Sequence, residues 1–316
     1  MSFRKESGTL LPKKLKENAT IGIVAPSYPI LPEHLAELKP GEDFLADLGF
    51  KLVFAKNYLN NKLGYGNTPE EKADDINNMF LDKKIDAILC AQGGNSANSV
   101  LPFIKWDIIK ANPKIFMGIS DITVLLNTIY QKTGLITFHG NDSYMWGIYN
   151  SAKAYDKTEF LNRLVHGKKT ITKLASWKTI RPGVAKGKLM GGNLNCILKL
   201  AGTKYFPDFS NSILFLEAYE TTPEICFYLF HQMKQTGVFE KIKGVVIGYI
   251  YGLEHDKSNP YQMEDILLEV TKEYTFPILK INEFGHCCSN TVLPVGAEAH
   301  LDADKQIFKI SDDFLI

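Results

Sequence analysis

Short apolar runs recur along the first half of the chain, and each is followed by a polar turn and a longer segment with helical spacing. The runs lie at 20–25, 50–55, 86–90, 115–119 and 135–138. Apolar runs of this length, rich in β-branched residues, predict buried strands. The segments between them, such as 41–48, 68–81 and 121–132, predict helices. Alternating strands and helices are typical of a parallel sheet with helices on both faces, in which ligands bind at the carboxyl ends of the strands.

Two helix starts are marked by the same local pattern. Thr68 and Thr222 each precede a proline and a glutamate. A threonine before proline in the first turn, with acidic residues at the positive end of the helix dipole, predicts an N-cap.

The second half has a different character. Its predicted strands lie at 213–216, 245–249, 277–281, 291–295, 298–302 and 306–310, which indicates a mixed, β-rich domain, and Gly191-Gly192-Asn193 opens a helix. No acidic residue occurs between residues 163 and 206, whereas Lys and Arg are frequent there. This stretch is either a solvated linker face or a wall that attracts anions. We predict an N-terminal α/β domain at 1–165, a crossover at 166–190 and a C-terminal domain at 191–316.

Composition narrows the function classes. The chain has 316 residues, 45% of them hydrophobic and 22% charged, as expected for a globular protein with a full core. Its net charge of +1 gives no reason to expect a nucleic-acid partner. No apolar run is long enough to span a membrane, and the first residues lack a secretory apolar segment. Five cysteines, an odd number, favour a reducing compartment, so we expect a cytoplasmic protein.

Ser120 lies between the predicted strand 115–119 and the predicted helix 121–132. A serine at such a turn can cap the helix, which is its commonest role. It can equally be a nucleophile presented on a sharp turn, with helix N–H groups beside it that stabilise an oxyanion. The nucleophile elbow of α/β-hydrolases has a second glycine two residues after the serine, and Ile122 stands there instead. The stretch alone leaves both interpretations open.

Cofactor and metal motifs are incomplete. The segment from Gly183 to Lys188 has one residue too few for a phosphate-binding loop, and Leu189 stands where Ser or Thr would hold magnesium. His286 is followed directly by two cysteines, and such adjacent side chains do not converge easily on one tetrahedral ion. We therefore expect neither a cofactor nor a metal.

A charge-relay set is the remaining candidate chemistry. A nucleophilic Ser120 needs a histidine base, and the base needs an orienting carboxylate. His286 follows a predicted strand in a glycine turn, and His139 is its competitor after another strand. Glu217 ends an otherwise apolar strand, where a carboxylate must find a partner or lose several kcal/mol to desolvation.

Seven ordered sequence blocks resemble the serine peptidases of the LD-carboxypeptidase type, family S66, which includes the microcin C immunity proteins. The blocks are Ile21–Ser27, Ala87–Gly94, Leu101–Phe103, Gly118–Thr123, Gly191–Leu194, Leu214–Glu217 and Gly285–Gly296. The resemblance covers nearly the whole chain.

This resemblance implies specific roles for the candidate residues. Ser120 would be the nucleophile, Glu217 the orienting carboxylate and His286 the base. The N–H groups of Asp121 and Gly94 would form the oxyanion hole. It also implies a parallel-sheet N-terminal domain, a mixed C-terminal domain, a cleft between them and a homodimer.

The turn after the third predicted strand departs from the typical family pattern. LD-carboxypeptidases carry Arg-Gly-Gly-Tyr-Gly there, whereas this chain has Gln92-Gly93-Gly94-Asn95-Ser96, followed by Ala97-Asn98. This favours the microcin-immunity branch, although Ser96-Ala97-Asn98 replaces its usual Asn-Ser-Asn.

We therefore expect a small peptide or aminoacyl-nucleotide substrate, bound in part by Gly93, Asn95 and Asn98. Trp177, set among basic residues, would stack on a nucleobase, or else belong to the core or to a dimer interface. Murein tetrapeptide cleavage is the alternative activity. A non-catalytic module that binds a peptide or nucleotide is the alternative from another class.

Overall fold

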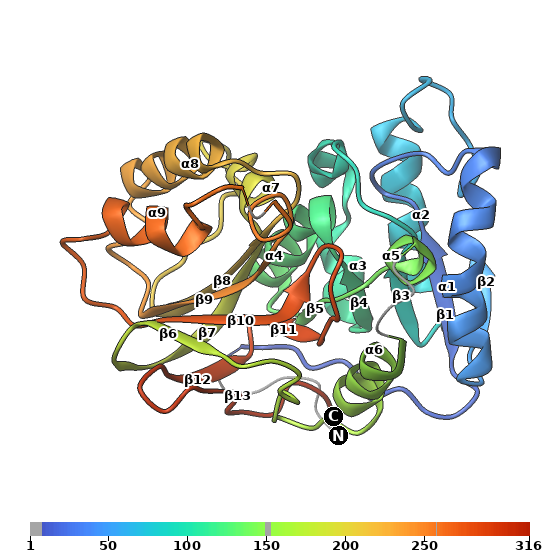
Figure 1. Cartoon of the computed structure of the whole chain (residues 1–316). Helices are drawn as coiled ribbons and strands as arrows, with labels where there is room; N and C mark the ends of the chain where they lie inside the picture. Colours follow the sequence, from blue (N-terminus) through green and yellow to red (C-terminus); the bar gives the residue numbers. More distant parts are fainter. Residues whose placement is uncertain (1–7, 149–152, 257) are drawn as a thin grey trace.

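The computed structural model describes residues 8–148, 153–256 and 258–316 and contains two β-sheets side by side (Figure 1). The six-stranded sheet comes mostly from the first half of the chain, and the seven-stranded sheet comes from the second half. Buried apolar side chains from both halves form one continuous core. The predicted two-domain α/β fold is confirmed.

The first sheet has the strand order β11-β5-β4-β3-β1-β2. Its strands are β1 (Thr20–Val24), β2 (Lys51–Phe54), β3 (Ala87–Cys90), β4 (Ile115–Gly118), β5 (Thr137–His139) and β11 (Leu293–Val295). All its pairs are parallel except β5 with β11. Strands β3, β4 and β5 are buried along their whole length, which explains their continuous apolar sequences.

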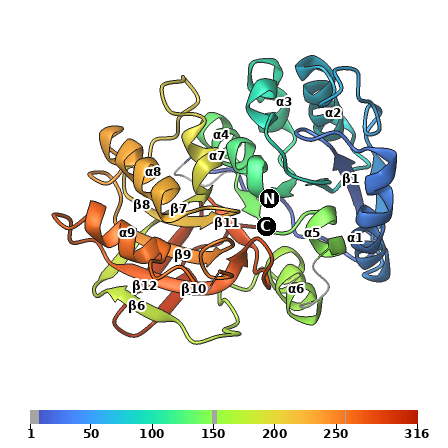
Figure 2. The same ribbon diagram turned by 45° about the horizontal axis from the view of Figure 1, so that its top comes forward.

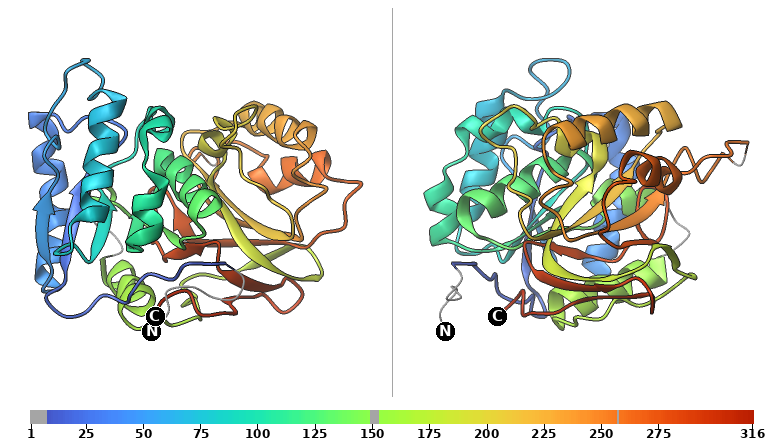
Figure 3. Two further views of the ribbon diagram at one scale, coloured as in Figure 1. Left: turned by 180° about the vertical axis from the view of Figure 1, so that it is seen from behind. Right: turned by 90° about the vertical axis from the view of Figure 1, so that its left-hand side faces the viewer.

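Helices cover both faces of this sheet (Figures 1 and 3). Helices α1 and α5 pack on each other on one face, and α2, α3 and α4 lie on the other. Their bounds are α1 (Leu35–Asp47), α2 (Pro69–Leu81), α3 (Trp106–Ala111), α4 (Thr123–Thr133) and α5 (Ser143–Ile148), with short 3-10 helices at Pro32–His34, Ala97–Phe103 and Ser120–Ile122. The predicted cap of α2 is confirmed, because the Thr68 side chain accepts a hydrogen bond from the Glu71 N–H.

The second sheet is mixed and has the order β13-β12-β7-β8-β9-β10-β6. Its strands are β6 (Lys178–Arg181), β7 (Val184–Asn193), β8 (Ser212–Ala218), β9 (Gly244–Ile250), β10 (Ile278–Gly285), β12 (Glu298–Asp302) and β13 (Ile307–Ile310). Strands β7 to β10 run parallel, and β6, β12 and β13 pair antiparallel. Helices α8 (Pro223–Gln235) and α9 (Met263–Val270) pack together above this sheet in Figure 1.

The chain passes between the sheets through α6 (Lys153–Phe160) and a π-helical turn at Leu161–Val165. The predicted crossover at 166–190 is not a plain linker, because β6 and most of β7 lie within it and belong to the second sheet.

Several long-range contacts join the two parts. Strand β11 comes from the end of the chain yet pairs with β5 of the first sheet. Helix α4 contacts α7 (Leu194–Leu198) where the two parts meet (Figure 2). There the Asn127 side chain bonds both backbone groups of Gly191, and the Asn193 N–H donates to Thr123. The carboxyl ends of β4, β7, β8 and β10 therefore face one shared region.

Candidate active site

Ser120 occupies a strained turn between β4 and the helix that follows. Its φ is +62°, a left-handed conformation that costs a non-glycine residue on the order of 1–3 kcal/mol. The Ser120 side chain does not cap either the 3-10 helix at 120–122 or α4, so the capping interpretation is not supported. Strain of this kind persists where the surrounding structure holds a residue in place for function.

The Gly93–Gly94 turn lies directly against this serine. A Cβ atom built on Gly93 would lie 2.7 Å from Cβ of Ser120, 3.0 Å from its Oγ and 3.5 Å from the Asp121 nitrogen. Only glycine allows this approach, and it brings backbone of the β3 turn beside the Ser120 hydroxyl and the Asp121 N–H. Two backbone segments thus face the position where an oxyanion would form.

His286 and Glu217 form a buried pair on the other side of the serine. The Nδ1 atom of His286 lies 2.6 Å from Oε2 of Glu217. Glu217 is in β8 and completely buried, and His286 directly follows β10. A hydrogen bond at Nδ1 fixes the tautomer and orientation of the imidazole and leaves Nε2 available for proton transfer.

Each member of this pair favours the charged form of the other. Burial disfavours the ionised form of both groups. For Glu217, the charge of His286 and their hydrogen bond outweigh burial, so the pKa of Glu217 is lowered. For His286, Glu217 and then Asp142 outweigh burial, so the pKa of His286 is raised. Asp142 is itself buried, and burial raises its pKa to about 7.

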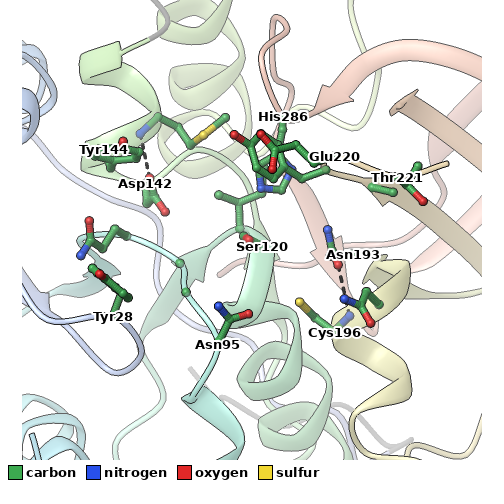
Figure 4. A pocket seen from close by; sticks show the side chains of 18 of the residues that line it. Tyr28, Asn95, Ser120, Asp142, Tyr144, Asn193, Cys196, Glu220, Thr221 and His286 are labelled. Carbon is green, nitrogen blue, oxygen red and sulfur yellow. Dashed lines mark hydrogen bonds between the residues drawn. The ribbon is translucent and has the colours of Figure 1, made fainter. Parts of the chain in front are cut away.

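These groups surround one cavity of about 520 Å³. Figure 4 shows Ser120 near its centre, with Tyr28, Asp142 and Tyr144 on one side and Asn193 and Cys196 on the other. The walls come from both sheets and carry four tyrosines, Tyr28, Tyr144, Tyr219 and Tyr228. The centroids of the Tyr219 and His286 rings lie 4.8 Å apart. The size suits a small-molecule substrate.

Most of the residues predicted from the sequence meet here. Ser120, His286, Gly93, Gly94 and Asn95 line the cavity. Glu217 lies behind His286, and the Asp121 carboxylate is completely buried behind the serine turn.

Asn98 is not brought to the cavity. It is exposed in the 3-10 helix after the glycine turn and is not among the described residues that line the cavity.

Trp177 is not brought there either. It is buried, its Nε1 donates to Glu283 at 2.8 Å, and Lys173 lies over its ring. A ring enclosed in this way cannot stack on a nucleobase in this conformation.

His139, the competing base, is fully buried against Phe215 and Phe284, with ring centroids at 5.2 and 6.2 Å. Burial lowers its pKa to about 4. It is not among the described residues that line the cavity, whereas His286, the other histidine proposed as the base, is one of them.

The sequence did not point to Asp142, Tyr219 or Glu220 as cavity residues. Asp142 follows β5, so its place after a predicted strand was an available signal. Glu220 has a φ of +47°, which has no sequence signature. In the described residues, no cluster of His, Cys, Asp and Glu could hold a metal ion. Nor does the described chain contain a helix long and apolar enough to cross a membrane.

Two family models match this chain. Residues 21–140 match the LD-carboxypeptidase N-terminal domain of peptidase family S66, and residues 186–301 match its C-terminal domain. The chain belongs to the LD-carboxypeptidase family. The resemblance predicted from the sequence blocks is confirmed, and membership supports a peptidase or related hydrolase.

Relatives in this family differ in their named activities. The chain is 30% identical to the "Probable murein peptide carboxypeptidase" of Bacillus subtilis, over 92% of this chain and 91% of that protein. It is also 30% identical to the microcin C7 self-immunity protein MccF of Escherichia coli, over 98% of both chains. A structure of MccF in complex with glutamyl sulfamoyl guanosine superposes with a TM-score of 0.89, at 27% identity over 97% of this chain and 99% of that chain.

Proposed function

We propose that this protein is a serine-type hydrolase that cleaves an amide-like bond between an aminoacyl or peptidyl group and a nucleotide-like leaving group. The observation that carries the proposal is the arrangement of Ser120, His286 and Glu217, which come from three different strands and act around one cavity. A strained serine, a buried His–Glu pair and a glycine turn at one place support a serine-type mechanism.

The residues have defined roles in the reaction. His286 accepts the Ser120 proton at Nε2 as Oγ attacks the scissile carbonyl carbon. The resulting oxyanion receives hydrogen bonds from the N–H groups of Asp121 and Gly94. His286 then donates its proton to the leaving nitrogen, and the acyl group remains on Ser120. A water molecule, deprotonated by His286, attacks this ester, and His286 returns that proton to Ser120 Oγ as the acyl group leaves as a free acid. Glu217 keeps the imidazole in register and stabilises its charged form throughout.

Two observations support a nucleotide-like leaving group. The glycine turn reads Gln92-Gly93-Gly94-Asn95-Ser96, without the arginine and tyrosine of the pattern typical of LD-carboxypeptidases. Tyrosine rings on both walls of the cavity offer apolar faces to an aromatic group. Murein tetrapeptide cleavage is the second candidate, favoured by the similarity to the B. subtilis protein.

Product analysis separates these candidates. The purified protein is incubated with a murein tetrapeptide and with sulfamoyl adenosines that carry glutamyl, leucyl and lysyl groups, and products are identified by mass spectrometry. We expect release of the free amino acid and the sulfamoyl nucleoside, and Ser120→Ala should abolish it. Release of D-Ala alone would favour murein cleavage. Binding without turnover of any compound would favour a non-catalytic module.

A further inference from the structure

The side chain of Asp121 forms a buried junction behind the nucleophile turn. Its Oδ2 accepts hydrogen bonds from the Ser27 hydroxyl at 2.6 Å and from the Ala97 N–H at 2.7 Å. Its Oδ1 lies 2.7 Å from the Lys199 ammonium group. The carboxylate has no exposed surface. A buried charge with three donors is well stabilised, and removal of one donor leaves it poorly compensated.

The three donors come from three separate parts of the chain. Ser27 lies beyond β1 of the first sheet, and Ala97 begins the 3-10 helix that follows the Gly93–Gly94 turn. Lys199 ends α7 and belongs to the second half of the molecule. Its ammonium also lies 3.4 Å from the carbonyl oxygen of Asn95, inside the glycine turn segment. One carboxylate and one lysine therefore connect the nucleophile turn, the glycine turn and the second domain.

This junction bears on the oxyanion donors. The backbone N–H of Asp121 is one proposed donor, and the other, Gly94, lies three residues before Ala97. Donors of this kind are effective only when they are held close to the position of the developing charge, because catalysis loses much of its rate when they move. Ser120 is also held in a strained conformation that the surroundings must impose.

We infer that Lys199 and the Asp121 carboxylate are positioning residues that set the geometry of the oxyanion hole across the domain interface. Neither residue is among the described residues that line the cavity. The first domain supplies both N–H donors, and the second domain fixes their spacing through Lys199. The inference rests on the proposed serine mechanism.

A second lysine nearby has a different role. Lys72 donates to the carbonyl oxygen of Ser27 at 2.7 Å and to the Ser96 hydroxyl at 2.9 Å, and the Asp121 carboxylate acts on it through charge. It supports the same loop from within the first domain. Lys199 is the residue through which the second domain reaches this junction.

The test compares Lys199→Met, Lys199→Gln, Lys199→Arg and Asp121→Asn with the control Lys241→Met. The control removes an exposed lysine of the second domain that lies 3.8 Å from Asp208. For each variant, a fluorophosphonate titration counts the active sites, so that kcat is expressed per competent molecule. A boronic acid analogue of the aminoacyl group probes the tetrahedral state, and the nucleoside product probes ground-state binding.

We expect Lys199→Met and Asp121→Asn to lower kcat by about 10²- to 10³-fold, the loss typical of one oxyanion donor, with KM within about threefold. Boronic acid affinity should fall in step with kcat, whereas affinity for the nucleoside product should not change. Lys199→Arg should restore most of the rate, Lys199→Gln should be intermediate, and Lys241→Met should match the wild type.

Three outcomes are distinguishable. Wild-type kcat per active site in Lys199→Met would overturn the inference and leave the serine mechanism intact. A loss of titratable sites with normal kcat per remaining site would also overturn it, because the pair would then only stabilise the fold. If Ser120→Ala retained activity, the proposed function itself would fail.

Discussion

Gly93 lies so close to Ser120 that even a methyl group would reach the nucleophile. At 2.7 Å from Cβ of Ser120, an added carbon is far inside normal contact distance. We therefore expect Gly93→Ala to lower kcat by at least about 10²-fold, because the serine turn or the glycine turn must shift and the oxyanion donors move with it. Steady-state kinetics measure this effect.

The control for this prediction is Gly49→Ala. Gly49 has a φ of +87° and no atom within 4 Å of an added Cβ, so alanine there introduces backbone strain without a clash. It should lower stability slightly and leave kcat unchanged. Full activity in Gly93→Ala would show that the two turns are farther apart in solution than in this structure.

The pH dependence of activity should report the His286–Glu217 pair. The base must be neutral, so kcat/KM should rise with pH through the pKa of His286, which the Glu217 and Asp142 carboxylates raise above 6.5. Glu217→Gln removes the carboxylate that raises the pKa of His286 more. We expect the acid limb to move to lower pH and kcat to fall by about 10⁴-fold.

Profiles of kcat/KM between about pH 5 and 9 for both proteins provide the measurement. Because Asp142 has a pKa of about 7, the limb describes coupled groups rather than one residue. Glu217→Asn is the matched variant that also shortens the side chain. An acid limb at the same pH in wild type and Glu217→Gln would contradict the assignment of Glu217.

Single residues were predictable where local sequence carries the chemistry. Ser120, Glu217 and His286 each end or follow an apolar strand, and the family resemblance of the surrounding sequence blocks indicated a role for each of them. Asp142 had a signal in its place after a predicted strand, whereas Tyr219 and Glu220 were not predictable as cavity residues, because strands distant in sequence bring the cavity walls together. Trp177 misled for the same reason: a tryptophan among lysines suggests a binding site, but its partner Glu283 is 106 residues away.

Secondary structure was predictable where one signal dominated. The buried parallel strands have continuous apolar sequences, and the threonine caps of α2 and α8 accept the expected hydrogen bonds. Strand β7 was missed because its first half alternates exposed and buried residues and its glycines weaken the strand pattern. Strand β6 is partly exposed and charged, and it lies at the edge of its sheet.

The segment around Trp177 is expected to act as a structural element. Glu283 accepts hydrogen bonds from the backbone N–H groups of Leu174 and Ala175 as well as from Trp177. We expect Trp177→Ala to lower the free energy of unfolding by about 3–5 kcal/mol, as loss of a buried aromatic ring does. KM for an aminoacyl sulfamoyl adenosine should change little.

Urea unfolding and steady-state kinetics test both parts. Trp177→Phe keeps most of the ring volume but loses the N–H donor, so its loss of stability should be smaller. If Trp177→Ala instead raised KM roughly 5- to 150-fold with normal stability, the ring would contact the substrate and the segment would have to open in solution.

At the scale of the whole molecule, the two sheets are linked by more than one chain crossing. Strand β11 carries the chain from the second sheet back to the first, and the last residue, Ile316, bonds the backbone of Pro12 and Lys14. The order of the two domains was predictable from the sequence. The contacts that the end of the chain makes with the first half were not, because a pairing of three residues between distant segments leaves no periodic signal in the sequence. The cavity depends on them, since its walls come from both sheets.

This linkage predicts that the two parts unfold together. Trp106 and Trp146 lie in the first half and Trp177 in the second. In the double variant Trp106→Phe/Trp146→Phe, fluorescence comes from Trp177 and reports the unfolding of the second half. In Trp177→Phe, it comes from Trp106 and Trp146 and reports the unfolding of the first half. Within each variant, the urea midpoint from fluorescence should coincide with the midpoint from far-ultraviolet circular dichroism, because strand β11 cannot be lost without disrupting the core that both halves share. Circular dichroism follows both sheets, so each variant serves as its own reference for any change in stability.

A fluorescence transition that precedes or follows the circular dichroism transition would show that one domain is stable alone, and the cavity would then be lost before the protein unfolds.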